Sequence, residues 1–287
     1  MKLVRALLLT VPFSASASAQ PPAGQVPRFG TRVEVVKVSV LVRGSDGPIL
    51  GLRAMDFEVR DNGVPQQVER VRSEELPLNV ILTLDVSGSV KGEKLVELKR
   101  ASHGLVDGLR PGDRVAFLTF AERLRLKPPL GVDFGAIHAR IDALDAEGGT
   151  ALMDGTFAAL TLGDALGGRA LAIVFTDGLE NVSWLREDDV IEAARRSDVV
   201  VYAVRAGGEA PRFLGAVAST TGGRVLTADS PDRLRPAFLA ILAEFRTRYL
   251  LSYTPRGVGR RGWHRLDVRV KERAAKVVAR KGYLVPQ

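Results

Sequence analysis

Five oxygen-bearing side chains in this sequence have types and positions that suit metal binding. Asp85, Ser87 and Ser89 come directly after an apolar run, and Asp177 comes after a second apolar run. Thr150 stands between them in the chain, directly after two glycines. Three hydroxyls and two carboxylates form an all-oxygen ligand set, which suits a hard cation such as Mg²⁺, with Mn²⁺ or Ca²⁺ as alternatives. We therefore expect a site that binds a partner through a metal rather than one that cleaves a substrate.

The balance of charge in this set indicates how the metal would act. Neutral hydroxyls in direct contact leave most of the charge of the ion uncompensated, whereas Asp85 and Asp177 would hold it mainly through water. An Asp or Glu carboxylate from a protein partner could then replace one water. The alternative is that Ser87 and Ser89 cap the following helix and that the aspartates cap their own strand-to-helix turns. Capping does not account for Gly148-Gly149-Thr150 or for the matching strand context of the two aspartates.

The elements that must position these residues alternate between strand and helix from Leu78 onward. Short apolar runs predict buried strands, and apolar residues at helical spacing predict the helices between them. Such alternation predicts a mostly parallel, doubly wound sheet with helices on both faces. The carboxyl ends of its strands meet at one edge, so Asp85 and Asp177 should face the same crevice. The expected strands are 80–84, 115–120, 170–175, 199–204 and 224–226, and the expected helices are 94–109, 134–144, 152–166, 188–196, 212–219 and 231–246.

Both flanks of this block read as β structure. Residues 33–42 alternate with one apolar face, and Asn62-Gly63 is a strong hairpin signal between a strand at 57–60 and a return strand at 67–71. Neither flank is large enough for a core of its own, so we expect them to pair into one β-sandwich with the α/β domain inserted. The expected strands after the block are 249–253, 263–270 and 276–282. The expected parts are β-sandwich at 30–77, α/β domain at 78–248 and β-sandwich at 249–287.

The N-terminus has the features of a secretion leader. Lys2 and Arg5 precede an apolar stretch too short to span a bilayer, and Ala17-Ser18-Ala19 is a small-residue cleavage site. We expect a signal peptide at 1–19 and a flexible lead-in at 20–29. The chain has no cysteine, which excludes a lipid anchor at the leader, and no later stretch is apolar enough for a membrane span. The expected location is the periplasm or the medium of a bacterium.

Charge and composition narrow the range of expected binding partners. The formal net charge of +8 becomes +6 without Lys2 and Arg5, and much of the excess lies in the last forty or so residues. No aromatic platform interleaves these charges, so nucleic acid is not expected as a partner. The basic residues are either a solvated face or a contact for an anionic surface.

Other chemistry finds little support in the sequence. His103, His138 and His264 have no metal-binding neighbour in sequence and are expected to be surface or packing residues. No nucleophile elbow, P-loop or dinucleotide fingerprint follows a strand. A metal-dependent phosphatase remains an alternative, although Ser at position 87 replaces the second carboxylate that such enzymes use. Trp184 either forms a binding hot spot near the metal or packs its own loop.

The residues quoted resemble the von Willebrand factor A domain. Its metal-ion-dependent adhesion site matches at every position, and the resemblance covers roughly 78–248. The flanks, with Phe57-Glu58-Val59 and residues 249–253 and 279–283, are similar to exported bacterial proteins described as von Willebrand factor A-related, often from Acidobacteria. The resemblance implies the fold, a divalent metal and a protein-binding role without enzymatic activity. A structural or assembly protein of the cell envelope, with a non-essential metal site, is the alternative. The matching residues are Asp85, Ser87, Ser89, Thr150 and Asp177.

Overall fold

The computed structural model describes residues 35–72, 76–126, 133–178, 180–207, 211–271 and 274–285. Residues 34–287 form one compact unit. The expected leader and lead-in lie outside the described residues, as do parts of the loops at 121–132, 179–187 and 205–212 that border the expected site. None of the helices in the described ranges is long and apolar enough to cross a membrane.

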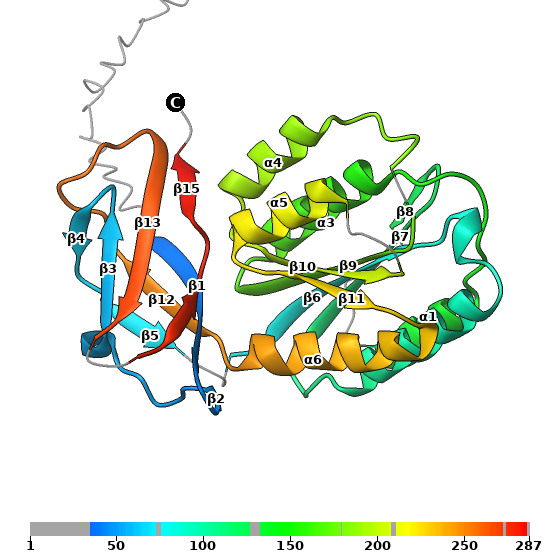
Figure 1. The fold of residues 1–287 in the computed structure, drawn as a ribbon, viewed down its shortest axis with the longest axis horizontal. Helices are drawn as coiled ribbons and strands as arrows, with labels where there is room; N and C mark the ends of the chain where they lie inside the picture. The colour runs from blue at the N-terminus through cyan, green and yellow to red at the C-terminus, as the bar shows by residue number, and fades with distance from the viewer. Residues whose placement is uncertain are drawn as a thin grey trace, which may run out of the picture. The chain divides into compact units, whose positions relative to one another are not determined.

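A six-stranded sheet in the order β11-β10-β9-β6-β7-β8 forms the centre of the α/β part (Figure 1). All neighbours run parallel except β8, which is antiparallel to β7. β6 and β9 are covered on both faces, which is why their sequences are nearly continuous apolar runs. The strands are β6 (Leu78–Asp85), β7 (Arg114–Phe120), β8 (Leu124–Leu126), β9 (Arg169–Thr176), β10 (Val200–Ala206) and β11 (Val225–Ala228).

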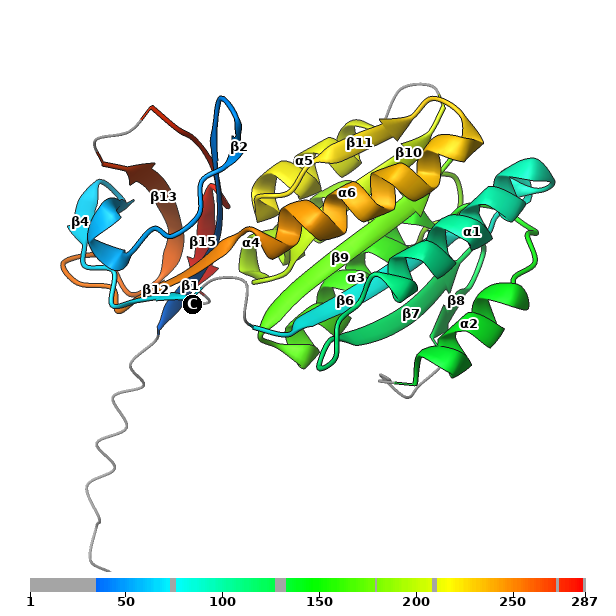
Figure 2. The same ribbon diagram turned by 90° about the horizontal axis from the view of Figure 1, so that it is seen from below.

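Helices cover both faces of this sheet (Figures 1 and 2). Because side chains alternate along a strand, Leu82 and Leu84 of β6 pack into the core on one face and Ile81 into the core on the other. The first face carries α1 (Glu93–Asp107), α2 (Phe134–Asp142) and α6 (Leu234–Arg246), with the short 3₁₀ turn η3 (Pro231–Arg233) before α6. The second carries α3 (Leu152–Leu166), α4 (Glu187–Arg196) and α5 (Arg212–Thr221).

The two chain ends pair with each other in a β-sandwich. β1 (Val36–Gly44) lies antiparallel to β12 (Tyr249–Tyr253), and β3 (Phe57–Asp61) lies antiparallel to β13 (Gly262–Val270). The buried face of β1 packs with Tyr249, Leu251 and Tyr253 in a third core. This arrangement confirms the expected fold class, a doubly wound α/β domain inserted into a sandwich made from both ends. The sheet orders are β14-β1-β12-β5, with β2 (Gly47–Pro48) beside β1, and β15-β13-β3-β4.

Two strands of the sandwich differ from the prediction. The hairpin forms at Asn62 and Gly63, which both have positive φ, but β4 (Val64–Gln66) ends early. The chain then crosses to the other sheet as β5 (Arg70–Arg72), so the predicted return strand at 67–71 is wrong. The hairpin sequence specifies its turn but not how long the two strands stay paired.

The predicted strand at 276–282 is two strands in different sheets. β14 (Lys276–Val278) pairs with β1, and β15 (Gly282–Val285) pairs with β13. The chain changes sheets next to Gly282, where an added Cβ would lie only 2.2 Å from the carbonyl oxygen of His264. The point where the chain passes from one sheet to the other therefore depends on a close backbone approach between distant segments. The alternation of apolar residues along the sequence does not reveal such an approach.

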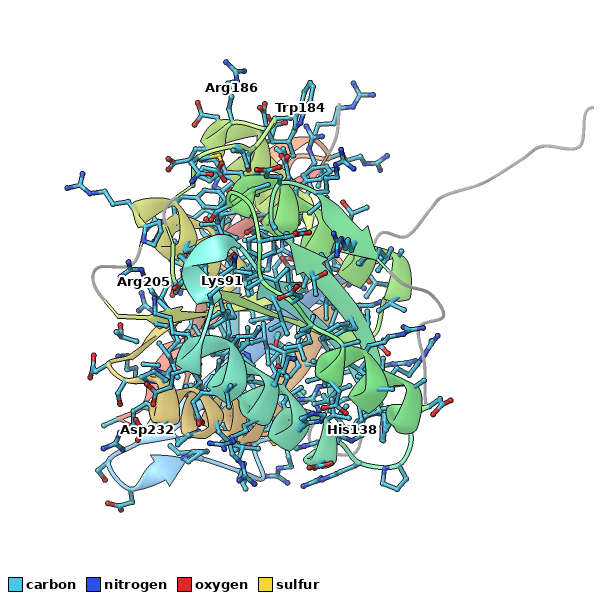
Figure 3. The ribbon with its side chains drawn as sticks, turned by 90° about the vertical axis from the view of Figure 1, so that its right-hand side faces the viewer. Lys91, His138, Trp184, Arg186, Arg205 and Asp232 are labelled. Carbon is cyan, nitrogen blue, oxygen red and sulfur yellow. The ribbon has the colours of Figure 1, made fainter. Side chains whose placement is uncertain are left out.

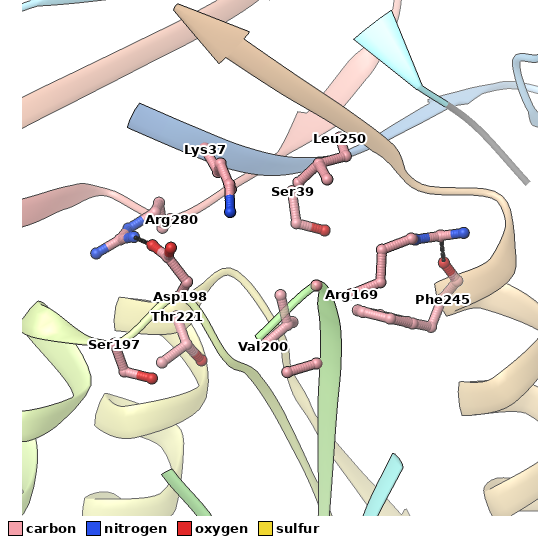
Figure 4. A pocket seen from close by; sticks show the side chains of 12 residues that line it. Lys37, Ser39, Arg169, Ser197, Asp198, Val200, Thr221, Phe245, Leu250 and Arg280 are labelled. Atoms are coloured by element: carbon pink, nitrogen blue, oxygen red, sulfur yellow. Dashed lines mark hydrogen bonds and ion pairs between the residues drawn. The ribbon is translucent and has the colours of Figure 1, made fainter. Parts of the chain in front are cut away.

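Buried arginines join the sandwich to the α/β part. Arg248 is fully buried, and its guanidinium donates to Ser39 of β1, to the Tyr202 hydroxyl of β10 and to the carbonyls of Gly222 and Val278. Figure 4 shows a second place at this junction, where Arg280 pairs with Asp198. The two parts are therefore connected by directed hydrogen bonds as well as by the chain itself.

Candidate metal centre

The ends of two neighbouring strands position the aspartates of the predicted site. β6 ends at Asp85 and β9 ends at Thr176, one residue before Asp177, and the two strands are parallel neighbours. The loop after β6 is also tied to the loop that carries Thr150, because the Gly88 amide donates to the Gly148 carbonyl at 2.9 Å. The three segments therefore meet at one edge of the sheet.

Gly178 shows how closely the predicted ligands approach each other. A Cβ added to Gly178 would lie 3.2 Å from Thr150 Oγ1, 3.4 Å from Ser89 Oγ and 3.9 Å from Asp85 Oδ2. Three of the five predicted residues thus surround one small space beside Gly178.

Hydrogen bonds link the remaining two predicted residues to this group. Ser89 Oγ donates to Asp177 Oδ1 at 2.6 Å and lies 3.1 Å from Ser87 Oγ. Asp85, Ser87 and Thr150 are buried, whereas Ser89 is exposed, so the group is open to solvent on the side of Ser89. The donor set fits a hard divalent cation, since it consists of hydroxyl and carboxylate oxygens.

The structure does not support the part of the capping alternative that concerns the two serines. Ser87 precedes the short 3₁₀ turn η2 (Gly88–Val90), but its side chain makes no capping hydrogen bond. The residue at the N-cap of α1 is Gly92, which has no side chain to offer. The two serine hydroxyls are therefore not used to cap the helix that follows them.

Asp85 is held rigidly and is inaccessible. Its Oδ1 accepts from the Ser87 amide at 2.9 Å and its Oδ2 accepts from Thr176 Oγ1 at 2.6 Å. Burial raises the pKa of Asp85, the hydrogen bonds from Ser87 and Thr176 lower it in part, and the charge of Asp177 raises it further. A buried carboxylate with both oxygens engaged is poorly placed for nucleophilic attack, so this geometry does not favour the phosphatase alternative.

Lys94, in the first turn of α1, is a member of this site that the sequence analysis missed. Its Nζ lies 2.5 Å from Asp177 Oδ2 and 3.2 Å from the Ser89 carbonyl oxygen. The Asp177 side chain has no exposed surface, so the ammonium is the counter-ion of a buried carboxylate. The spacing of Lys94 after the serine motif was the available signal, but only packing shows that the side chain turns back to the loop.

The loop after Asp177 is fixed by carboxylates. Glu180 accepts hydrogen bonds from the amides of Val182 and Ser183 in its own loop and of Met153 in α3. Asp154 of α3 accepts from the Trp184 amide at 3.0 Å. Burial opposes the ionised form of Glu180, but the hydrogen bonds outweigh it and lower its pKa.

Trp184 itself points into solvent. Its side chain is 93% exposed, although its backbone is anchored. Figure 3 shows Trp184 beside Arg186 at one end of the face that also carries Lys91, which follows Ser89 by two residues. Of the two interpretations of Trp184, the structure excludes packing onto its own loop.

The histidines divide into two kinds. His264 is a packing residue, as expected, and its buried Nδ1 contacts Asp61 Oδ1 at 2.8 Å. His103 and His138, far apart in sequence, lie side by side on the surface of α1 and α2. Across the described ranges no group of three or more His, Cys, Asp or Glu side chains is arranged to hold a metal, which leaves the hydroxyl-rich site as the only one of the predicted type.

The family model of the von Willebrand factor type A domain matches residues 79–238. This chain belongs to the von Willebrand factor A family. Proteins of this family commonly mediate binding or adhesion between proteins, and a divalent metal binds at the adhesion site of such domains. The match covers the whole of the sheet from β6 to β11 and most of its helices.

Relatives and solved structures agree with this assignment. An uncharacterized protein of Synechocystis, sll0103, is 40% identical over 82 residues, which is 28% of this chain and 20% of that protein. Proximal thread matrix protein 1 from the mussel byssus, in a structure with a zinc-occupied adhesion-site motif, has a TM-score of 0.53 at 22% identity over 64% of this chain and 49% of that one. A von Willebrand factor type A protein from Catenulispora acidiphila has a TM-score of 0.53 at 16% identity over 90% of this chain and 76% of that one.

The covered length and the sequence identity limit what each of these similarities shows. The chain spans a fifth of the length of the curated relative from Synechocystis. The two solved structures are below 25% identity, so they show that the fold is shared and nothing about the partner of this chain.

Proposed function

We propose that this chain is an exported, metal-dependent protein-binding module. Mg²⁺, with Mn²⁺ or Ca²⁺ as alternatives, would be held by Ser87, Ser89 and Thr150 directly and by Asp85 and Asp177 mainly through water. When bound, the ion supplies an electrophilic centre for a carboxylate of an Asp or Glu on a protein partner. The observation that carries the proposal is the convergence of Thr150, Ser89 and Asp85 oxygens on the space beside Gly178.

The surroundings of the site support a protein partner. Ser89 is exposed, so a ligand can approach the predicted metal from solvent. Trp184 is a rigidly anchored and almost fully exposed aromatic side chain, and Trp and Arg are the residue types that most often dominate binding energy at interfaces. Arg186 beside it, with a side chain that is 84% exposed, adds a positive charge that suits an acidic partner.

Export and localisation belong to the same proposal. The leader-like residues 1–19 and the absence of cysteine support a periplasmic or released protein. Contact with an anionic surface through the basic C-terminal strands would be an additional, electrostatic interaction and is not required for metal-dependent binding.

Metal binding is tested by calorimetric titration of Mg²⁺ and Mn²⁺ into the purified protein. We expect one ion per chain, and we expect the Asp85→Ala substitution to weaken binding at least tenfold, because it removes one of two carboxylates that hold the ion. Asp232→Ala is the matched control, since Asp232 is an exposed aspartate outside the site. Equal affinity in the parent and Asp85→Ala proteins would contradict the proposal.

Partner binding is tested by capture from an envelope extract with the immobilised protein. A partner gripped through the metal should elute with EDTA, and Trp184→Ala should retain less of it while binding Mn²⁺ as the parent does. A partner that stays bound in EDTA would favour the alternative, a structural or assembly protein whose metal site is not essential.

A further inference from the structure

His103 and His138 form a cluster with two aspartates on the surface between α1 and α2. The Nδ1 atoms of the two histidines lie 2.6 Å apart. His103 Nε2 lies 2.8 Å from Asp142 Oδ1, and His138 Nε2 lies 3.2 Å from Asp107 Oδ1. We call these four residues the histidine pair with its two carboxylates.

The cluster has a reciprocal construction. Each helix contributes a histidine and an aspartate four residues later, so both lie on the same side of the helix. Each histidine then contacts the aspartate of the other helix rather than its own. This sequence pattern, His-x-x-x-Asp in two predicted helices, was the signal by which the cluster could have been found.

The two rings face each other edge to edge. Their planes are inclined by only 19° and their centroids are 4.9 Å apart. Together with the Nδ1–Nδ1 distance of 2.6 Å, this separation places both Nδ1 atoms on the line between the ring centres. The in-plane lone-pair direction of each Nδ1 therefore points at the other histidine.

The carboxylates determine which ring nitrogens carry protons. An ionised carboxylate only accepts hydrogen bonds, so the contacts of the two Nε2 atoms with Asp142 and Asp107 favour the tautomer with the proton on Nε2, which in a neutral imidazole leaves Nδ1 as a bare acceptor. Two bare acceptors cannot stay in contact without a cation between them. The two negative charges of Asp107 and Asp142 also favour positive charge at this point.

We propose that the histidine pair binds a divalent transition-metal ion such as Zn²⁺, Ni²⁺ or Cu²⁺ through both Nδ1 atoms. Imidazole nitrogen is a preferred ligand for these metals. A carboxylate on the far nitrogen of each ligating histidine is the usual outer partner of such sites, because it orients the ring and makes it a better donor. Asp142 and Asp107 stand in these two positions.

Coordination requires a small movement of the rings. Two nitrogens at about 2.0–2.1 Å from a tetrahedral ion lie about 3.3 Å apart, so the Nδ1 atoms must separate and the rings must tilt. The histidine side chains are 29% and 31% exposed, which leaves room for this rotation. Water would complete the coordination. Figure 3 shows His138 at the opposite end of the face from Trp184. The histidine pair is therefore separate from the predicted metal centre of Asp85, Ser87, Ser89, Thr150 and Asp177, which we call the adhesion-type site.

The test is titration of tag-free protein with Zn²⁺ and Ni²⁺ by calorimetry, with electron paramagnetic resonance of the Cu²⁺-loaded protein. Excess Mg²⁺ is present throughout to occupy the site of Asp85 and Asp177, and we expect one further ion per chain, with nitrogen superhyperfine structure from two imidazoles. His103→Gln and His138→Gln, prepared separately, should each lower the affinity at least tenfold. Asp142→Asn should lower it about tenfold, because the outer carboxylate no longer orients His103.

Two controls show whether a loss of binding comes from the histidine pair itself. Asp85→Ala removes a predicted ligand of the other site and should bind Zn²⁺ as the parent does, so failure of the proposed function would not affect this result. Circular dichroism and the melting temperature verify that each histidine variant is folded.

If the parent bound none of Zn²⁺, Ni²⁺ and Cu²⁺, the proposal would be overturned, and a proton shared between the two rings would explain their close contact. Unchanged affinity in both histidine variants would overturn it equally.

Discussion

At the scale of single residues, Lys94 is the side chain that most changes the expected behaviour of the adhesion-type site. Its ammonium is a permanent counter-ion for Asp177, whose side chain is completely buried. Without a metal, Lys94 offsets the repulsion between Asp177 and Asp85. With a metal, the same positive charge lies close to the ion and opposes its binding. We therefore expect Lys94 to stabilise the metal-free protein and to weaken its affinity for the proposed metal.

Replacing Lys94 should separate these two effects. Lys94→Gln should lower the free energy of unfolding of the metal-free protein by about 1–3 kcal/mol, because a buried carboxylate loses its charged partner. It should raise the affinity for Mg²⁺ roughly fivefold, since a positive charge beside the ion is removed. Thermal denaturation in EDTA and calorimetric titration measure the two quantities.

Lys91 provides the matched control for this substitution. It is an exposed lysine three residues before Lys94, ahead of α1, so Lys91→Gln makes the same change of charge without touching Asp177. If Lys94→Gln were as stable as the parent in EDTA and bound Mg²⁺ equally well, the counter-ion role would be wrong.

At the scale of elements, one buried ion pair connects the ends of two strands to the end of α6. Asp113, just before β7, accepts hydrogen bonds from the amides of Leu78 and Arg110 and from Arg246 of α6 at 2.6 Å. Burial opposes the charged form of Asp113, but these donors and the charge of Arg246 outweigh it, so its pKa lies below the ordinary value. The pair fixes α6 against the amino edge of the sheet.

This pair predicts a specific dependence of stability on pH. Because the pKa of Asp113 is lowered by folding, its contribution is complete above the pKa of the unfolded chain, about 3.9, and is lost as the pH falls through the folded value. Asp113→Asn should therefore be less stable than the parent by about 3 kcal/mol at pH 7. The difference between the two proteins should become smaller below about pH 4.

Chemical denaturation at pH 7, 5 and 3 measures this difference. Asp46→Asn, at an exposed turn of the sandwich, is the control and should leave stability nearly unchanged at all three values. A constant difference between parent and Asp113→Asn over this range would show that the ionisation of Asp113 is not what stabilises the junction.

At the scale of the whole molecule, the sandwich is assembled from strands that precede and follow the α/β domain in the chain. β1 takes its partners β12 and β14 from the far end of the chain. Arg248 lies where α6 passes into β12, and it joins Ser39 of the sandwich to Tyr202 and Gly222 of the α/β part. We therefore expect the two parts to unfold together.

Arg248→Lys tests this coupling. A lysine keeps the charge but cannot donate in the planar, forked geometry that reaches all of these acceptors. The free energy of unfolding should fall by about 3 kcal/mol or more, because buried acceptors lose their donor. Amide hydrogen exchange should become faster in β1 and around Gly222. The exposed Arg269 of β13 is the control, and Arg269→Lys should change neither quantity. Unaltered exchange in β1 of the Arg248 variant would contradict the coupling.

The tertiary structure decided what the sequence pattern could not reach. Lys94 contacts Asp177 across eighty-three positions, and His103 contacts His138 across thirty-five, so the sequence around each residue does not show which partner it meets. The same holds for residues 276–282, which divide between two sheets at a corner set by the contact of Gly282 with the His264 backbone. These features depend on which surfaces meet after packing.

The sequence by itself determined the elements and the likeness to the adhesion-type motif. Apolar periodicity is a property of neighbouring residues, and it located five of the six strands of the central sheet closely, whereas the exposed edge strand β8 is not among the strands expected from the sequence. The placement of Asp85 and Asp177 after two such strands predicted a common edge, since parallel strands end on the same side. Side-chain partners across helices and loops follow no such local rule, because their geometry is set by the packing of the folded chain.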